Sequence, residues 1–164
     1  MIFLTVGTWH NGYDRLVEAI DQLLNNSVIS EEVVGQIGYS SYKPKHMIVM
    51  DFCSPDEFIS MVSKARILIS HAGMGTIIEA VKQAKPIIVV PRKPELGEVD
   101  NDHQFATARQ LEEEGKILVA YEVDNLPEKI EQAKTFVPAQ GQGNLGIINA
   151  VQVFIDDLVR RKGS

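Results

Sequence analysis

Short runs of apolar residues alternate along the chain with longer segments in which apolar residues recur every three or four positions. The short runs have the length of buried strands, and the longer segments have the period of amphipathic helices. The predicted strands are residues 2–6, 33–37, 47–52, 67–69, 87–90 and 117–120. The predicted helices are residues 13–24, 54–64, a segment that starts at Thr76, and residues 102–114, 124–134 and 147–160. This alternation predicts an α/β fold, a single Rossmann-like domain over residues 1–164 with a mainly parallel sheet and helices on both faces.

Two of these helices have boundary signals beyond their periodicity. Ser54 provides an N-cap, Pro55 the first helical position and Glu57 the third residue of a capping box. Gly115 directly follows the segment 102–114 and is a typical helix stop. The last helix has one apolar side, which either packs on the core of this domain or docks on another protein.

The stretch from Arg66 to Pro91 is the strongest functional signal in the chain. It predicts a strand, a loop with Gly73 and Gly75, a helix and a second strand. Free N–H groups and the positive dipole end of a first helical turn bind anions, and glycines let a ligand approach the backbone. The stretch therefore predicts a phosphate-binding loop, although both glycines could simply be turn residues.

This loop differs from two common nucleotide-binding patterns. It lacks the Gly-Lys-Ser/Thr ending of nucleotide-hydrolysing loops, so a phosphate bound here is held and not cleaved. Ile78 stands where a dinucleotide-binding motif has its third glycine, although Glu95 and Glu98 follow at roughly the expected twenty residues. A dinucleotide-binding oxidoreductase module is therefore kept as an alternative.

Two side chains of this stretch each allow two interpretations. Glu79 comes three residues after Thr76, so the two residues fit a capping box, or Glu79 accepts both hydroxyls of a ribose beside the phosphate. His71, at the end of a strand, is either hydrogen-bonded within the protein or a donor to a ligand phosphate or sugar.

Other polar residues are expected at the same edge, because ligands of parallel sheets bind beyond the carboxyl ends of the strands. Gly7 and Thr8 end the first strand, and Trp9 follows, where it stacks on a ligand ring or covers the core. His103 and Gln104 open a helix after a polar loop, and an amide such as that of Gln104 can both donate to and accept from sugar hydroxyls. Residues 100–102 have the spacing of a metal-binding aspartate pair, but their composition favours a helix N-cap.

Composition excludes several classes of partner. The chain has 164 residues, 45% of them hydrophobic, with a formal charge of −6 and a pI near 5.2. It offers no basic face for nucleic acid or an anionic bilayer. Its single cysteine, Cys53, excludes an internal disulfide and fits a reducing compartment. The first apolar run ends within six residues and has no basic lead, so we expect neither a signal peptide nor a transmembrane segment there.

Several ordered motifs over residues 1–121 resemble a known family. They are Ser70-His71-Ala72-Gly73-Met74-Gly75-Thr76, Glu79-Ala80, Lys85-Pro86, Val89-Val90-Pro91-Arg92 and Asp102-His103-Gln104, with Thr5-Val6-Gly7-Thr8 and Tyr13-Asp14-Arg15-Leu16 at the start. The chain resembles the C-terminal, donor-binding domain of family 28 glycosyltransferases. It is most similar to the short stand-alone subunits of two-component UDP-sugar transferases, the eukaryotic dolichol-linked type and the bacterial capsule and exopolysaccharide type.

The resemblance implies the C-terminal half of a GT-B fold that binds a UDP-sugar. The diphosphate would be held by Gly73, Met74, Gly75 and Thr76, and the ribose by Glu79. The sugar would be bound by Gln104 together with Asp102 and His103. The facing edge of the cleft would be lined by Gly7 and Thr8, and His71 would contact phosphate or sugar. Neither a cofactor nor a metal is expected. The bacterial subunits usually have histidine where this chain has Trp9, with His10 next, and their Asp-Asn-His-Gln motif differs slightly from Val99-Asp100-Asn101-Asp102-His103-Gln104.

The resemblance also implies a partner. A membrane-anchored, acceptor-binding subunit would supply the catalytic base and the lipid-linked acceptor, and residues 147–162 would dock on it. The pair would transfer a hexose, hexuronic acid or N-acetylhexosamine with inversion, at the cytoplasmic face of the membrane. The alternative from another class is a non-catalytic accessory subunit that stabilises or stimulates a partner glycosyltransferase.

Overall fold

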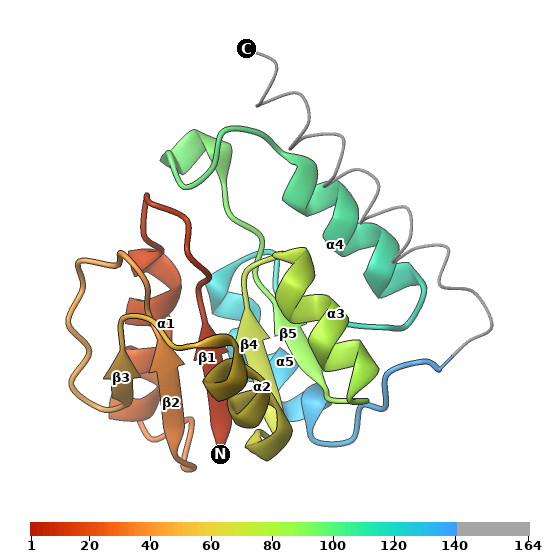
Figure 1. Ribbon diagram of the computed structural model, residues 1–164, viewed down its shortest axis with the longest axis horizontal. Helices are drawn as coiled ribbons and strands as arrows, with labels where there is room; N and C mark the ends of the chain where they lie inside the picture. Colours follow the sequence, from red (N-terminus) through yellow and green to blue (C-terminus); the bar gives the residue numbers. More distant parts are fainter. Residues whose placement is uncertain (141–164) are drawn as a thin grey trace.

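The computed structural model describes residues 1–140, and in this range strands and helices alternate along the chain except where two strands follow one another within residues 33–50 (Figure 1). The strands of this part are β1 (Ile2–Thr5), β2 (Val33–Gln36), β3 (Ile48–Met50), β4 (Ile67–Ser70), β5 (Ile87–Val89) and β6 (Leu118–Val119). Its helices are α1 (Asp14–Asn25), α2 (Pro55–Lys64), α3 (Met74–Lys82), α4 (His103–Glu113) and α5 (Leu126–Ala133), with short 3-10 turns η1 (Pro94–Leu96) and η2 (Val123–Asn125).

The described strands form one parallel sheet of six strands in the order β3-β2-β1-β4-β5-β6. The strand order reverses direction between β1 and β4, which are hydrogen-bonded neighbours with Thr5 opposite Ser70. This is the order of doubly wound dinucleotide-binding folds, in which ligands bind outside the carboxyl ends of the strands at the reversal. The α/β, Rossmann-like prediction is therefore confirmed, and the side of the sheet on which all six strands end is called the carboxyl edge below.

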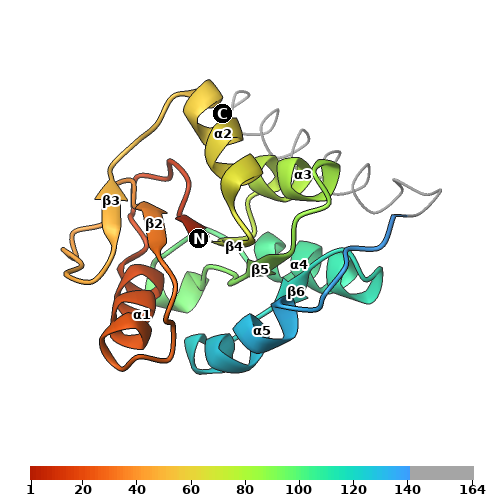
Figure 2. The same cartoon turned by 90° about the horizontal axis from the view of Figure 1, so that it is seen from below.

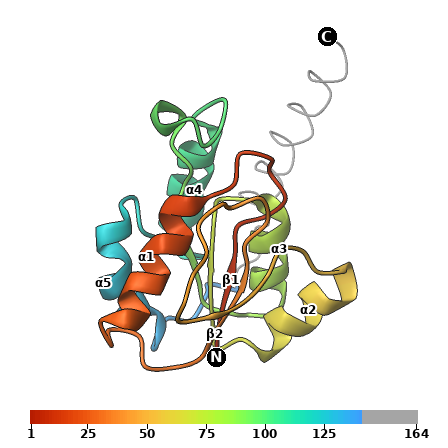
Figure 3. The same cartoon turned by 90° about the vertical axis from the view of Figure 1, so that its left-hand side faces the viewer.

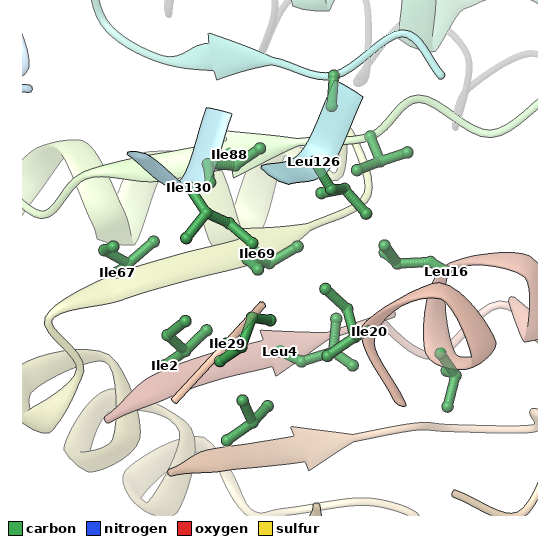
Figure 4. Close-up of a cluster of buried hydrophobic side chains, with 14 of the residues drawn as sticks. Ile2, Leu4, Leu16, Ile20, Ile29, Ile67, Ile69, Ile88, Leu126 and Ile130 are labelled. Atoms are coloured by element: carbon green, nitrogen blue, oxygen red, sulfur yellow. The ribbon is translucent and has the colours of Figure 1, made fainter. Parts of the chain in front are cut away.

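Helices cover both faces of the sheet, as the views in Figures 2 and 3 show. Alternate residues of a strand point to opposite faces, so Ile2 and Leu4 pack with α1 and α5, whereas Phe3 packs with α2, α3 and α4. Figure 4 shows the first of these two cores, in which isoleucine and leucine side chains from strands and helices interlock. Burial on both faces explains why β1, β4 and β5 read as continuous apolar runs, whereas β3, at the edge of the sheet, is largely exposed.

Most predicted boundaries lie within two residues of the observed ones. The capping box of α2 is present, because the Ser54 hydroxyl accepts from the Glu57 N–H and the Glu57 carboxylate accepts from the Ser54 N–H. The predicted start of α3 at Thr76 is wrong: the helix begins at Met74 with Gly73 as its N-cap. The predicted helix over residues 147–160, and its proposed docking role over residues 147–162, lie outside the described residues. None of the helices within residues 1–140 has the length and apolar character needed to cross a bilayer.

Candidate functional site

The first turn of α3 presents backbone N–H groups at the carboxyl edge. Gly73 caps this helix with extended backbone, and no side chain of residues 1–140 caps its free N–H groups. Met74 and Thr76 bury their side chains, whereas Gly75 is exposed. A Cβ atom placed on Gly75 would meet no described atom within 4 Å. We call the N–H groups of residues 74–76 the amide corner; it combines open space, hydrogen-bond donors and the positive end of a helix dipole.

The His71 imidazole lies next to the amide corner, wedged between two glycines. A Cβ atom on either Gly7 or Gly73 would lie less than 3.0 Å from atoms of this ring. Gly7 also has a φ of +73°, which side chains other than glycine rarely adopt. The loops after β1 and β4 can therefore approach each other this closely only with glycine on both sides of the imidazole.

His71 is held neutral in this position. Burial, helped by the positive charge of Arg92, lowers the pKa of the imidazole to about 4, and a hydrogen bond to the Thr5 backbone partly opposes this shift. The ring nitrogen Nδ1 lies 3.4 Å from the Ser70 hydroxyl. Near pH 7 the uncharged ring has one N–H group, which donates to the Thr5 backbone, and its other nitrogen can only accept a hydrogen bond.

Gln36 joins the ends of β1, β2 and β3, a role that its sequence position did not indicate. This buried side chain accepts a hydrogen bond from the Thr5 hydroxyl at 2.6 Å. It donates to the backbone carbonyls of Gly7 at 3.1 Å and Asp51 at 2.9 Å. In the sequence, the only sign of this role is a glutamine at the end of an apolar strand. Its effect is to fix the Gly7 side of the site.

Arg92 is a second residue whose role the sequence did not reveal. It is 1% exposed, and its guanidinium donates to the carbonyl of Val6 at 2.9 Å, to that of Glu98 at 3.2 Å and to that of Gly12. Its guanidinium carbon lies 4.5 Å from the centroid of the Tyr13 ring. The only sequence signal was a charged residue directly after a buried strand.

Glu98 is fully engaged within the protein. Its carboxylate accepts from Arg15 at 2.8 and 2.9 Å and from the Lys93 N–H at 2.8 Å. Glu95, the other acidic residue at the expected distance, lies in η1 and is exposed. Because Glu98 is bonded in this way, it is not free to accept ribose hydroxyls, and of these two residues only Glu95 remains for the dinucleotide alternative.

The start of α4 carries the predicted sugar-binding residues. Asp102 is the N-cap residue, but the atom that caps the helix is Asn101 Oδ1, which accepts from the His103 N–H at 3.2 Å. Asp102 and His103 are exposed. Gln104 accepts from the Arg92 backbone N–H at 3.1 Å, so its NH₂ group is what it can offer a ligand. Within the described residues, no group of three or more His, Cys, Asp or Glu side chains is placed to hold a metal ion.

The predicted capping box of Thr76 and Glu79 is not formed, because Thr76 lies inside the helix and not at its N-cap. The Glu79 carboxylate instead accepts from Gln83 Nε2 at 2.6 Å. Thr8 is exposed after β1, and the half-buried Trp9 ring lies 4.8 Å from the His10 ring between centroids. The structure thus brings Gly7, His71 and Gly73 into direct contact, and it places α3 and α4 with their N-termini on the same side of the sheet (Figure 1).

Solved structures share this architecture. MurG of Acinetobacter baumannii superposes with a TM-score of 0.59 at 17% identity, covering 98% of this chain and 49% of that chain. The glycosyltransferase of kitacinnamycin gives a TM-score of 0.59 at 18% identity, covering 98% of this chain and 42% of the other. Such likeness at low identity shows the fold, one half of a GT-B glycosyltransferase.

Sequence relatives agree with the fold. The chain is 31% identical over 126 residues to the UDP-N-acetylglucosamine transferase subunit ALG13 of Mus musculus, covering 70% of this chain and 10% of that protein. The chain thus spans a small part of this relative. The model of the glycosyltransferase family 28 C-terminal domain matches residues 1–139. The chain therefore belongs to the C-terminal domain family of glycosyltransferase family 28.

Proposed function

We propose that this chain is the donor-binding subunit of a two-component inverting glycosyltransferase, and that its donor is a UDP-sugar. The observation that carries the proposal is the amide corner, with open space at Gly75 and the neutral His71 ring beside it. Membership of the family supports the reaction class. The name of the mouse relative, a UDP-N-acetylglucosamine transferase subunit, supports the choice of UDP as the nucleotide of the donor.

The amide corner would hold the donor pyrophosphate. Met74 and Thr76 bury their side chains, so these residues would contribute backbone N–H groups, as would Gly75. Hydrogen bonds from N–H groups to an anionic oxygen are roughly twice as strong as bonds between neutral groups. The neutral His71 ring would contact the phosphate or the sugar without adding charge. This set of donors makes a bound metal unnecessary for holding the diphosphate.

The rest of the donor would lie along α3 and the start of α4. Glu79, one turn beyond the amide corner, would accept the ribose hydroxyls in place of its bond from Gln83. Gln104 would donate its NH₂ group to the sugar, with Asp102 and His103 at its rim. A hexose, a hexuronic acid and an N-acetylhexosamine all offer hydroxyl groups that suit such contacts.

The reaction would be a direct displacement. A base on the acceptor-binding partner removes the proton of an acceptor hydroxyl, and the oxygen attacks the anomeric carbon. The bond between that carbon and the β-phosphate oxygen breaks on the opposite face, so the configuration inverts and UDP leaves. The amide corner stabilises the negative charge that develops on the departing phosphate.

The partner would face the carboxyl edge, where the donor presents its anomeric carbon. We place it there as a membrane-anchored subunit that carries a lipid-linked acceptor, which would bring this chain to the cytoplasmic face of the membrane. Tyr39 and Phe52 follow β2 and β3 at this edge and are 59% and 46% exposed, with ring centroids 5.1 Å apart. Exposed aromatic residues are typical anchors of protein interfaces, so this pair suits a contact with the partner.

Glu79→Ala tests the proposal, and the chain offers a matched control. Glu18 on α1 accepts from Gln22 at the same four-residue spacing as Glu79 accepts from Gln83, so Glu18→Ala removes an equivalent helix pair. UDP should raise the melting temperature of the wild type and of Glu18→Ala, and it should raise that of Glu79→Ala much less. Stabilisation by NAD and none by UDP would contradict the proposal.

A transfer assay with the partner, the product of a neighbouring gene, distinguishes a donor-binding subunit from a non-catalytic accessory subunit. We expect Glu79→Ala to reduce sugar transfer by the complex at limiting donor concentration. If the complex keeps full activity with Glu79→Ala while it loses activity without this chain, the accessory alternative is favoured.

A further inference from the structure

We infer that Arg92 is the positioning residue of this site: it clamps the loops around the amide corner and supplies a buried positive charge that the donor pyrophosphate neutralises without touching it. The inference rests on the proposed function. It concerns a residue that contributes through other groups and not through direct contact with the donor.

The clamp is visible in the hydrogen bonds of Arg92. Its guanidinium binds the carbonyls of Val6 and Gly12, at the two ends of the loop after β1, and the carbonyl of Glu98 in the loop after β5. Its backbone N–H donates to Gln104 at 3.1 Å, which sets the start of α4. One residue therefore joins three segments that reach the carboxyl edge.

A short path of contacts connects this clamp to the amide corner. Arg92 holds the carbonyl of Val6, and the next residue, Gly7, packs against the His71 ring. The same ring also packs against Gly73, the N-cap of α3, since a Cβ on Gly73 would lie less than 3.0 Å from its Nε2 and Cε1 atoms. The position of the first turn of α3 relative to the loop after β1 thus depends on groups that Arg92 fixes.

The charge around Arg92 is not balanced. Arg15 and Arg92 both lie against the Tyr13 ring, at 5.3 and 4.5 Å from its centroid, and Glu98 is the carboxylate paired with Arg15. Arg92 Nε and Arg15 Nη1 are buried and have no hydrogen-bond partner among residues 1–140. The cluster therefore carries an excess positive charge inside a chain whose formal charge is −6. Such a buried cation favours an incoming anion, because the interior screens charges weakly.

Two properties of neighbouring groups agree with this placement. The Arg92 charge helps to lower the pKa of His71, which requires the guanidinium to lie close to the imidazole. Burial lowers the pKa of Arg92 itself, as expected for a cation that its neighbours compensate incompletely. A pyrophosphate at the amide corner would supply the missing negative charge.

The test compares ligands that differ only in their phosphates. In Arg92→Met we expect the affinity for UDP to fall roughly tenfold or more, while the affinity for uridine changes less than about threefold. Arg92→Lys keeps the charge and should restore most of the UDP-to-uridine affinity ratio. Arg66→Met, at an exposed arginine that pairs with Glu31 at the start of β4, is the control and should leave both affinities unchanged. Calorimetry measures the affinities, and NMR titration should show a higher His71 pKa in Arg92→Met.

Several outcomes would overturn the inference. An equal loss of UDP and uridine affinity in Arg92→Met would assign Arg92 a purely structural role. If the ratio of UDP affinity to uridine affinity does not change, an electrostatic role of Arg92 is excluded. If Arg92→Met does not fold, Arg92→Gln, which keeps amide donors without the charge, takes its place with the same expectations. If the wild type does not bind UDP, the proposed function fails. Inorganic pyrophosphate then tests Arg92 alone: weaker binding in the variant supports the inference, and equal binding refutes it.

Discussion

Replacing Gly75 by alanine should separate the stability of the protein from its ability to bind a nucleotide. Gly75 lies in the first turn of α3, is exposed, and has ordinary helical backbone without a positive φ. No described atom lies within 4 Å of an added Cβ. The substitution therefore introduces a methyl group into open space, at the point where the proposed pyrophosphate approaches the backbone.

The two effects have opposite signs. Alanine is favoured over glycine within helices by about 0.5–1 kcal/mol, so the free energy of unfolding should rise by up to that amount. For a chain of this size that corresponds to an increase of about 1–4 °C in melting temperature. A methyl group that displaces a phosphate oxygen from one charge-assisted hydrogen bond removes roughly 1.5–3 kcal/mol, or about 10- to 150-fold in affinity for UDP.

Thermal unfolding with and without UDP, followed by calorimetry, measures both quantities in one preparation. Gly73→Ala is the matched comparison, because the same change two residues earlier drives a Cβ into the His71 ring and should cost about 1–3 kcal/mol. If Gly75→Ala binds UDP as tightly as the wild type does, the proposed binding of the pyrophosphate at the amide corner is refuted. A large loss of stability in this variant would refute the claim that the space at Gly75 is open.

Three further predictions concern polar side chains, two of them at the carboxyl edge and the third, Asp21, on α1. The folded protein keeps His71 neutral down to about pH 4, whereas the unfolded chain takes up a proton near pH 6.5. Lowering the pH from 6.5 to 4 should therefore reduce the free energy of unfolding by up to about 3 kcal/mol through this group, and His71→Asn should show a smaller pH dependence than the wild type in urea titrations. Gln36→Leu leaves the Thr5 hydroxyl and the Gly7 carbonyl without this partner and should lose about 2–4 kcal/mol in chemical denaturation; unchanged stability would contradict its bridging role. Asp21 is buried on α1 and accepts the backbone N–H groups of residues 45 and 46, so Asp21→Ala should cost about 1–3 kcal/mol and speed hydrogen exchange at those two amides, which unchanged exchange would disprove.

The periodicity of the chain was sufficient to predict the sheet and most helices. The strands β1, β4 and β5 are buried on both faces and therefore read as apolar runs, and each helix shows its buried side at intervals of three or four residues. The start of α3 was placed two residues late because Gly73 and Gly75 were both read as loop residues. Gly75 in fact lies within the helix, where its lack of a side chain leaves the amide corner open.

The parts of the site that sequence reasoning missed depend on contacts between distant residues. Arg92 binds carbonyls of residues 6 and 12, and Gln36 binds those of residues 7 and 51. Backbone carbonyls exist at every position, so their partners leave no pattern in the sequence. Glu98 was considered as a ribose ligand on spacing alone, and its bonds to Arg15 became evident only in three dimensions.

The imidazole wedge between Gly7 and Gly73 also limits how relatives of this chain can diverge. A homologue that exchanges His71 for a small residue is released from the steric requirement for glycine at the N-cap of α3, whereas one that keeps histidine must keep it. Gly7 has a second reason to persist, its positive φ. Among homologues, residues 71 and 73 should therefore vary together, while position 7 remains glycine.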